Sequence, residues 1–194
     1  MSRYDAFEDP ACYPGTSVLI NSAGLRGQEA LDQFEQLMFL SRAEEDLPEG
    51  ELDYAHYQAI HHHFFQDVYD WAGQTRTVRT AKGGNWFCYP EFIETEMTRL
   101  FAALAEEDHL IDAGRAEFIT RAAHYLAEIN AVHPFREGNG RCQLTLLTIL
   151  VETSGRVLDE DRLEPEPFMA AMIESFSASN HALERCIDGI VLEG

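Results

Sequence analysis

The sequence predicts an all-α protein that carries one short β-hairpin. Apolar residues recur every three or four positions over most of the 194 residues, as they do in helices with one buried face. Residues 73–90 replace that spacing with alternating β-branched residues and a glycine-rich turn. Hydrophobic residues make up 45% of the chain, which is enough to form a core.

Residues 1–27 are expected to be an irregular N-terminal segment, because two prolines and three glycines interrupt it. A single domain is expected over residues 28–194. Asp53 is the expected N-cap of its second helix, and Gly155 is the expected C-cap of the helix that follows residue 141. The other expected helices cover about residues 28–45, 53–71, 91–107, 112–132, 166–176 and 179–191.

The segment 73–90 is predicted to form the hairpin, with its turn at residues 82–85. An isolated hairpin is barely stable in water, so this one is expected to pack on the helices or to act as a flap. The spacing fits two alternatives equally well. One is a surface hairpin without function, and the other is an edge that binds an extended segment of another protein.

Three consecutive histidines, His61 to His63, lie inside the second expected helix. Consecutive helical residues point about 100° apart, so the three side chains cannot converge on one metal ion. We expect one of them to lie against the core and the others to be solvated.

Residues 133–141, His-Pro-Phe-Arg-Glu-Gly-Asn-Gly-Arg, form the strongest functional pattern in the chain. Pro134 must end the helix before it, and Gly138 and Gly140 allow a tight turn into the next helix. Backbone N–H groups and the positive end of a helix dipole at such a turn favour a bound phosphate group. The run therefore predicts a phosphate-binding site.

The side chains of this run indicate catalysis. Glu137 is suited to hold Mg²⁺ against phosphates, and Arg141 to contact a phosphoryl oxygen. His133 has a near-neutral pKa and is suited to take a proton from a hydroxyl group, while Asn139 can bind a phosphate oxygen or fix the loop. A helix–turn–helix with a buried histidine explains each residue singly, but not the whole combination.

Charge and cysteine usage limit the partners and the compartment. With 14 basic and 34 acidic residues the formal charge is -20, which argues against binding to nucleic acid or to an anionic membrane. No stretch approaches the length of a membrane span. The four cysteines lack a C-x-x-C pair, which favours reduced thiols in a cytoplasmic protein. Cys142 lies at a helix start, where a thiol pKa can fall, but no base is adjacent to it.

The run from His133 to Arg141 resembles the HPFx(D/E)GNGR signature of the Fic-domain family at every defined position. The resemblance implies a Fic-type helical bundle and a Mg²⁺-dependent nucleotidyltransferase, which transfers AMP from ATP to a Ser, Thr or Tyr hydroxyl of a target protein. It also implies that His133 is the general base and Glu137 the Mg²⁺ ligand. The residues implied to bind the phosphates are Gly138, Asn139, Gly140 and Arg141.

Fic proteins also have a hairpin flap, upstream of the motif, that docks the target main chain beside the histidine. The pattern G-Q-x-R at 73–76 followed by K-G-G-x-x-F at 82–87 is similar to that element. The resemblance implies a flap over about residues 75–90. Its tip residues are Lys82, Gly83 and Gly84, and Phe87 is the residue expected to clamp the target.

The chain departs from the fuller family signature at Leu144, where the family has a second arginine that reaches the outer phosphate. Two alternatives therefore stay open. One is a transferase that uses another nucleotide donor, such as UTP or CDP-choline, or transfers a different phosphoryl unit. The other is a non-catalytic module that binds nucleotides and other proteins.

Many Fic proteins contain, or bind, an inhibitory helix with the pattern S/T-x-x-x-E-G/N. The nearest internal match begins at Ser41 and is followed by Asp46 instead of Gly or Asn, so we do not assign it this role. The chain then resembles the toxin half of a bacterial toxin–antitoxin pair. The expected partners are a small antitoxin that supplies the helix and a target protein, typically a type II topoisomerase subunit in such pairs.

Overall fold

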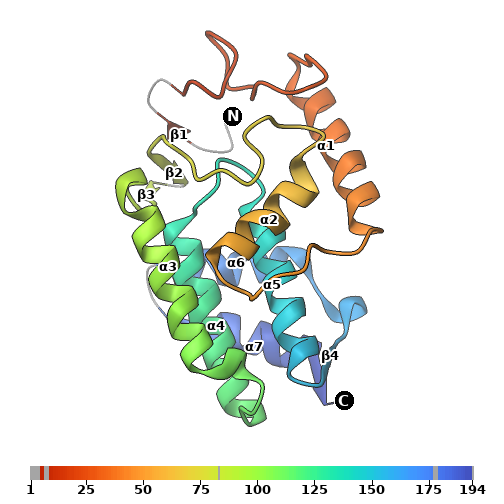
Figure 1. The fold of residues 1–194 in the computed structure, drawn as a ribbon, viewed down its shortest axis with the longest axis vertical. Coiled ribbons are helices and arrows are strands. Elements are labelled where there is room, and N and C mark those ends of the chain that lie inside the picture. Colours follow the sequence, from red (N-terminus) through yellow and green to blue (C-terminus); the bar gives the residue numbers. More distant parts are fainter. Residues whose placement is uncertain (1–4, 7–8, 83, 177–178, 194) are drawn as a thin grey trace. The chain divides into compact units, whose positions relative to one another are not determined.

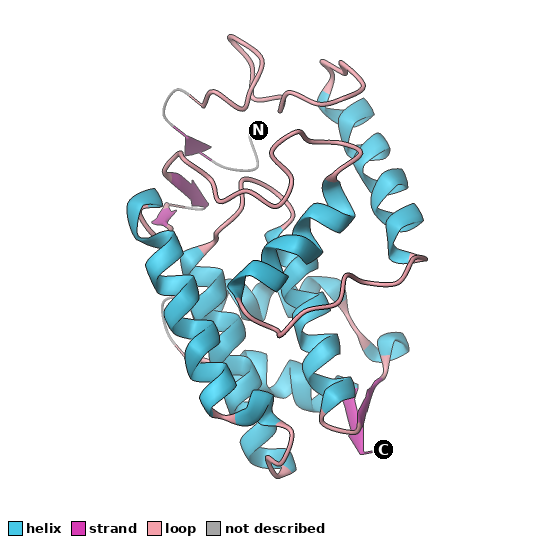
Figure 2. Cartoon of the chain, in the orientation of Figure 1, coloured by secondary structure: helices cyan, strands magenta, loops and turns pink. Residues whose placement is uncertain are grey.

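The computed structural model describes residues 5–6, 9–82, 84–176 and 179–193. Helices dominate this part of the chain and strands are few and short, which confirms the all-α class (Figures 1 and 2). The chain divides into two units. The first comprises residues 1–94 and 134–138, and the second comprises residues 95–133 and 139–194.

In the first unit, helices α1 (Gln28–Ala43) and α2 (Tyr54–Phe65) pack against each other. Phe39 of α1 meets Phe64 of α2 with 4.8 Å between the ring centroids. The predicted cap of α2 is confirmed, because the Asp53 carboxylate accepts a 2.8 Å hydrogen bond from the backbone N–H of His56.

Helix α2 ends at Phe65, earlier than the position near Trp71 that the sequence predicts. The backbone tightens there, since the N–H groups of both Val68 and Tyr69 donate to the Phe65 carbonyl. The Tyr69 ring then stacks on Trp71 at 4.3 Å, and its hydroxyl donates to the buried carboxylate of Glu35 on α1. The tertiary contacts of Tyr69 therefore end α2 at this point, although the spacing of apolar residues predicts that the helix continues.

The predicted hairpin is present in the first unit but is shorter than expected. Its strands are β2 (Thr80–Lys82) and β3 (Asn85–Trp86), which pair antiparallel with Lys82 opposite Asn85. A third strand, β1 (Asp5–Ala6), pairs antiparallel with β2, so the order in the sheet is β1-β2-β3. The hairpin is thus part of a small sheet, whose third strand comes from the segment that was expected to be irregular.

The second unit is helical and is arranged around α4 (Arg115–Val132). Helix α4 contacts α5 (Asn139–Thr153), α6 (Pro165–Ser175) and α7 (His181–Ile190). Most of α3 (Pro90–Glu106) also belongs to this unit, and the short 3₁₀ turn η1 (Asp108–Leu110) follows it. The α4 residues buried by this packing recur every three or four positions, as predicted: Phe118, Ala122, Tyr125, Leu126 and Ile129.

A second strand pair closes the chain and was not predicted. Strand β4 (Arg156–Leu158) pairs antiparallel with β5 (Val191–Glu193), with Val157 opposite Leu192. Gly155, the expected cap of α5, has φ +72° and lies two residues after the end of α5 and directly before β4. A second 3₁₀ turn, η2 (Glu160–Arg162), leads on to α6.

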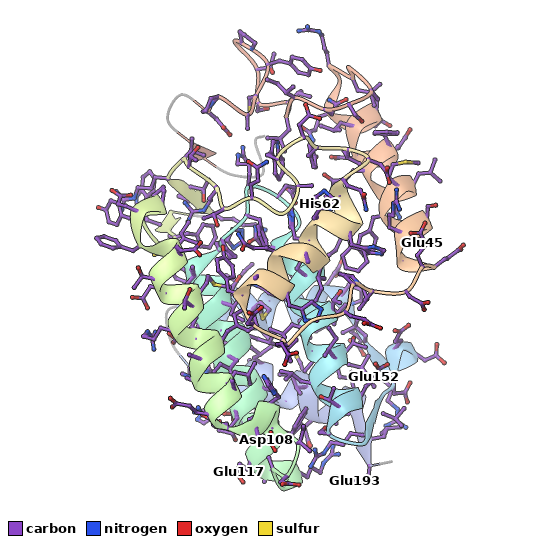
Figure 3. The ribbon with its side chains drawn as sticks, in the orientation of Figure 1. Glu45, His62, Asp108, Glu117, Glu152 and Glu193 are labelled. Carbon is purple, nitrogen blue, oxygen red and sulfur yellow. The ribbon has the colours of Figure 1, made fainter. Side chains whose placement is uncertain are left out.

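Acidic side chains lie on the outside of the second unit. Asp108, Glu117, Glu152 and Glu193, which are labelled in Figure 3, are all exposed. Within the described residues, no helix has the length and apolar character that crossing a membrane requires.

Candidate active site

The motif 133–141 runs through both units. His133 follows the last residue of α4, residues 134–138 form a loop of the first unit, and Asn139 begins α5 of the second. Each part is held by contacts of its own unit, and the peptide bonds of the loop join the parts.

His133 caps α4 in a left-handed conformation, with φ 54° and ψ 65°. Its backbone N–H donates to the Ile129 carbonyl at 2.8 Å, which completes the last turn, and Pro134 then prevents the helix from continuing. A left-handed non-glycine residue costs about 1–2 kcal/mol, so the helix end holds His133 in a strained backbone geometry. Its side chain is 6% exposed.

Phe135 anchors the motif loop in the aromatic core of the first unit. Its side chain is fully buried and stacks on Tyr57 at 5.5 Å and on His61 at 3.9 Å. Burying a phenylalanine stabilises the folded state by about 2–3 kcal/mol, so Phe135 holds the motif loop against the core of the first unit.

His61 is a positioning residue that the sequence did not identify. Its Nδ1 accepts a 2.8 Å hydrogen bond from the Gly73 N–H, so the ring proton is on Nε2. Nε2 then donates to the backbone carbonyl of Glu137 at 3.0 Å. His62 is exposed, and His63 is half-buried with Nε2 2.9 Å from the Arg42 carbonyl. The three rings point in different directions, and the useful signal in the sequence was the single histidine on the apolar side of α2.

Arg136 is held by an acidic residue of the N-terminal segment. Its Nε lies 2.5 Å from the Asp9 carboxylate, and both side chains are 6% exposed. Asp9 also accepts from the Ala11 N–H at 2.9 Å. Breaking a buried ion pair costs about 3–5 kcal/mol, so this pair fixes the loop beside Glu137.

Gly138 adopts φ +81° and has no room for a side chain. A Cβ atom there would lie 2.4 Å from Cε2 of Phe65 and 3.2 Å from Nε2 of His61. The turn that the sequence predicts at this position therefore depends on glycine for two reasons, conformation and space.

Glu137 is 8% exposed, and one of its carboxylate oxygens accepts from the Gly138 N–H at 3.1 Å. Mg²⁺ is usually bound by one or two carboxylates together with substrate phosphates and waters. A single buried carboxylate beside a turn that is predicted to bind phosphate fits that pattern.

Asn139, Gly140 and Arg141 form the first turn of α5. The first N–H groups of a helix have no intrahelical acceptor, so this turn suits a phosphate group. Asn139 is buried, Arg141 is half-buried and Gly140 is exposed. Gly140 does not have the positive φ of a turn glycine, because it already belongs to the helix.

Arg76 joins the hairpin to the motif loop inside the first unit. Its backbone N–H donates to the Pro134 carbonyl at 2.9 Å. Its buried guanidinium donates to the carbonyls of Val78 at 2.6 Å and Cys88 at 2.7 Å, which lie before and after the hairpin. Burial lowers the pKa of Arg76 to about 10, so it stays charged at neutral pH.

The flap residues differ in their exposure. Lys82 and Gly84 are exposed at the turn, and Gly83 lies outside the described residues. Phe87 is 7% exposed and its N–H donates to the Thr80 carbonyl, whereas the neighbouring Trp86 is 50% exposed. The role of Phe87 as a clamp stays a prediction, and the exposed ring beside it belongs to Trp86.

Cys142, one position beyond the motif, is fully buried in the second unit. Burial raises the pKa of its thiol well above the ordinary value, opposite to the effect expected at a helix start. The side chain therefore packs as a small apolar residue.

The fold and the motif define a class of mainly helical proteins whose HPFxEGNGR loop leads into a helix. The chain belongs to the Fic/DOC family, whose model matches residues 51–151.

Similar proteins come from several bacteria. A Sinorhizobium fredii protein named "Probable protein adenylyltransferase y4lH" is 63% identical over 178 residues, which are 91% of this chain and 93% of the relative. The Escherichia coli K12 protein named "Probable protein adenylyltransferase Fic" is 34% identical, with 98% of this chain and 96% of the relative covered. The crystal structure of BepC from Bartonella tribocorum with bound AMPPNP has a TM-score of 0.85 at 23% identity and covers 95% of this chain and 97% of that chain, which supports the fold.

Proposed function

We propose that this protein is a protein adenylyltransferase that transfers AMP from ATP to a Ser, Thr or Tyr hydroxyl of a target protein. The observation that carries this proposal is the intact run His133–Arg141, with its histidine at a helix end and its last three residues in a helix start. The names of the relatives support the same activity, since the 63% and 34% identical proteins are both named as adenylyltransferases.

In the proposed reaction, His133 takes the proton from the target hydroxyl as the hydroxyl oxygen attacks the α-phosphorus of ATP. The new bond joins that oxygen to the α-phosphorus, the bond between the α-phosphorus and the α,β-bridging oxygen breaks, and pyrophosphate leaves. Gly138, Asn139, Gly140 and Arg141 bind the phosphates. Positioning and electrostatic stabilisation by these groups provide most of the rate, as is general for phosphoryl transfer.

Glu137 is the proposed ligand of Mg²⁺, which neutralises phosphate charge when bound. The His61 bond to the Glu137 carbonyl and the Asp9–Arg136 pair hold the backbone on both sides of this carboxylate. The flap, with Lys82, Gly83, Gly84 and Phe87, is the proposed docking element for the target.

Leu144 favours a second candidate within the same chemistry. It is half-buried on α5 and cannot provide the charge of the arginine found at this position in the fuller signature. A transferase that uses UTP or CDP-choline is therefore the alternative donor class, and a non-catalytic nucleotide-binding module is the alternative outside enzymes.

We also propose partners and a compartment. A small antitoxin protein that supplies an inhibitory helix is the proposed regulator, and a protein, for instance a type II topoisomerase subunit, is the proposed target. The cytoplasm is the proposed compartment, because Cys12, Cys88, Cys142 and Cys186 are all free thiols.

The test is transfer of labelled AMP to proteins of a bacterial lysate by wild type and by His133→Ala. We expect the variant to lose about 10²–10⁴-fold in rate, because the general base is removed, while nucleotide binding and thermal stability are unchanged. His62→Ala is the matched control, since His62 is an exposed histidine of α2, and it is expected to retain wild-type transfer.

Equal transfer by His133→Ala would remove the histidine from its role. Labelling by UTP or CDP-choline but not by ATP would establish the alternative donor. Nucleotide binding without any labelled protein would establish the non-catalytic module.

A further inference from the structure

Arg79 lies between two aromatic rings just before the hairpin. Its guanidinium carbon is 4.4 Å from the centroid of the Trp86 ring and 3.9 Å from that of the Tyr89 ring. Both distances are within the range of cation–π contacts. Tyr89 in turn meets Phe92 edge-on at 6.5 Å. We call these four residues, Arg79, Trp86, Tyr89 and Phe92, the Arg79 patch; all belong to the first unit.

The three aromatic residues of the Arg79 patch are all exposed and lie next to one another. Trp86 is 50%, Tyr89 is 46% and Phe92 is 57% exposed. Adjacent exposed aromatic residues mark interaction surfaces on soluble proteins, and Trp, Tyr, Phe and Arg are the residue types enriched at protein interfaces.

Arg79 differs from several arginines of this acidic chain, which pair with carboxylates. Among the described residues, its guanidinium makes no hydrogen bond or ion pair, and its Nε is buried without an acceptor. The two terminal nitrogens of the guanidinium are not buried and also have no acceptor among the described residues, so an incoming carboxylate can form charge-assisted hydrogen bonds with them. The described arginines that pair with a carboxylate include Arg42, Arg99, Arg115, Arg121, Arg136 and Arg162.

We propose that the Arg79 patch docks a segment of the protein target in which a carboxylate is flanked by apolar side chains. The carboxylate pairs with the guanidinium of Arg79, and the apolar side chains cover Trp86 and Phe92. The inference rests on the proposed function, because an adenylyltransferase that modifies proteins must bind its protein target. It specifies that the region of the flap prefers a target segment with a carboxylate side chain.

The charge of the surroundings favours a single carboxylate over a polyanion. Arginine between aromatic rings is also a platform for single-stranded nucleic acid. However, exposed Glu91 and Glu94 follow on α3, and the chain carries a formal charge of -20. A strand with one phosphate for each nucleotide carries many charges that this field repels, whereas a single carboxylate carries one charge, which Arg79 can neutralise.

The test uses two blocked heptapeptides with a neutral fluorophore, one with a glutamate between leucine and phenylalanine and one with glutamine in its place. Fluorescence anisotropy with the full chain gives the dissociation constants. We expect the glutamate peptide to bind about tenfold more tightly, and Arg79→Gln to bring the ratio to about one. Arg79→Lys keeps the charge without the planar fork and is expected to retain part of the preference.

Arg26→Gln is the matched control, because Arg26 lies 4.2 Å above a single ring, that of Tyr13, and is exposed. It is expected to bind both peptides as wild type does. Equal binding of the two peptides by wild type, no binding up to millimolar concentration, or an unchanged ratio in Arg79→Gln would each overturn the proposal. Binding of a ten-nucleotide thymidine strand as tightly as the glutamate peptide would overturn it in favour of nucleic acid.

The assay contains no nucleotide, so its result is separate from that of the transfer experiment. Absent peptide preference with His133-dependent AMP transfer removes only the Arg79 patch. Peptide preference without AMP transfer leaves a docking surface on a protein whose proposed activity has failed.

Discussion

Gly138 occupies a position in which even a methyl group does not fit. We predict that Gly138→Ala lowers the free energy of unfolding by about 2–5 kcal/mol, the sum of a left-handed alanine and an overpacked contact with the Phe65 ring. Gly84→Ala is the matched control, because Gly84 has φ +84° but nothing within 4 Å of its Cβ position. It is expected to lose about 1–2 kcal/mol. Urea unfolding of both variants checks this, and equal losses would mean that the Phe65 contact is of no consequence.

The residues proposed to carry the chemistry are visible in the sequence, whereas the residues that hold the motif loop in place are not. Pro134 and the glycines follow from backbone rules that operate within a few residues. The partners of the loop come from far away in the chain. His61 is 76 positions from Glu137, and Asp9 is 127 positions from Arg136. The apolar face of α2 indicates that one histidine is buried, but no local pattern shows that His61 or Asp9 contacts the motif loop.

Helices were predicted better than strands for the same reason. The cap at Asp53 and the end of α4 before Pro134 depend on neighbouring residues, and both are confirmed. Strands β1 and β4 are two and three residues long, and their partners β2 and β5 are remote. So short a strand has no periodicity of its own and exists only through its pairing.

The carboxylate of Glu107 holds the segment between α3 and α4 against α4. Glu107 accepts from Arg121 Nε at 2.7 Å and from the Tyr125 hydroxyl at 2.8 Å. The hydrogen bonds from Arg121, more than any other contact, hold the pKa of Glu107 below its ordinary value. A carboxyl group with a lowered folded-state pKa stabilises the fold above its unfolded pKa of about 4.3, and the contribution is lost as the pH falls through the folded value.

We therefore predict that Arg121→Met is less stable than wild type at pH 7 by about 0.5–1 kcal/mol, because the pair is one-third exposed. The difference is expected to shrink as the pH falls below about 4, where Glu107 becomes protonated in both proteins. Denaturant unfolding at a series of pH values measures it. Arg99→Met removes the more exposed pair with Glu96 and serves as the control, with no expected change. A difference that stays constant down to pH 3 would assign the effect to packing of the Arg121 side chain.

The charge of the whole molecule is itself a source of instability. A formal charge of -20 on 194 residues produces mutual repulsion that the folded state concentrates and the unfolded chain relieves. Salt shortens the distance over which this repulsion acts, from about 30 Å at 0.01 M to about 8 Å at 0.15 M. Salt should therefore stabilise the folded state of this protein more than that of a protein with balanced charge.

We predict that raising NaCl from about 0.01 M to about 0.15 M at pH 7.5 increases the melting temperature by about 2–4 °C, equivalent to about 1 kcal/mol for a chain of this size. The same measurement near the isoelectric point of about 4.6 is the internal control, because the net charge vanishes there. If repulsion is the cause, the gain at pH 7.5 must disappear near pH 4.6. An equal gain at both pH values would mean that salt acts through exclusion from the surface or through a bound ion, and the net charge would then have no measurable effect on folding.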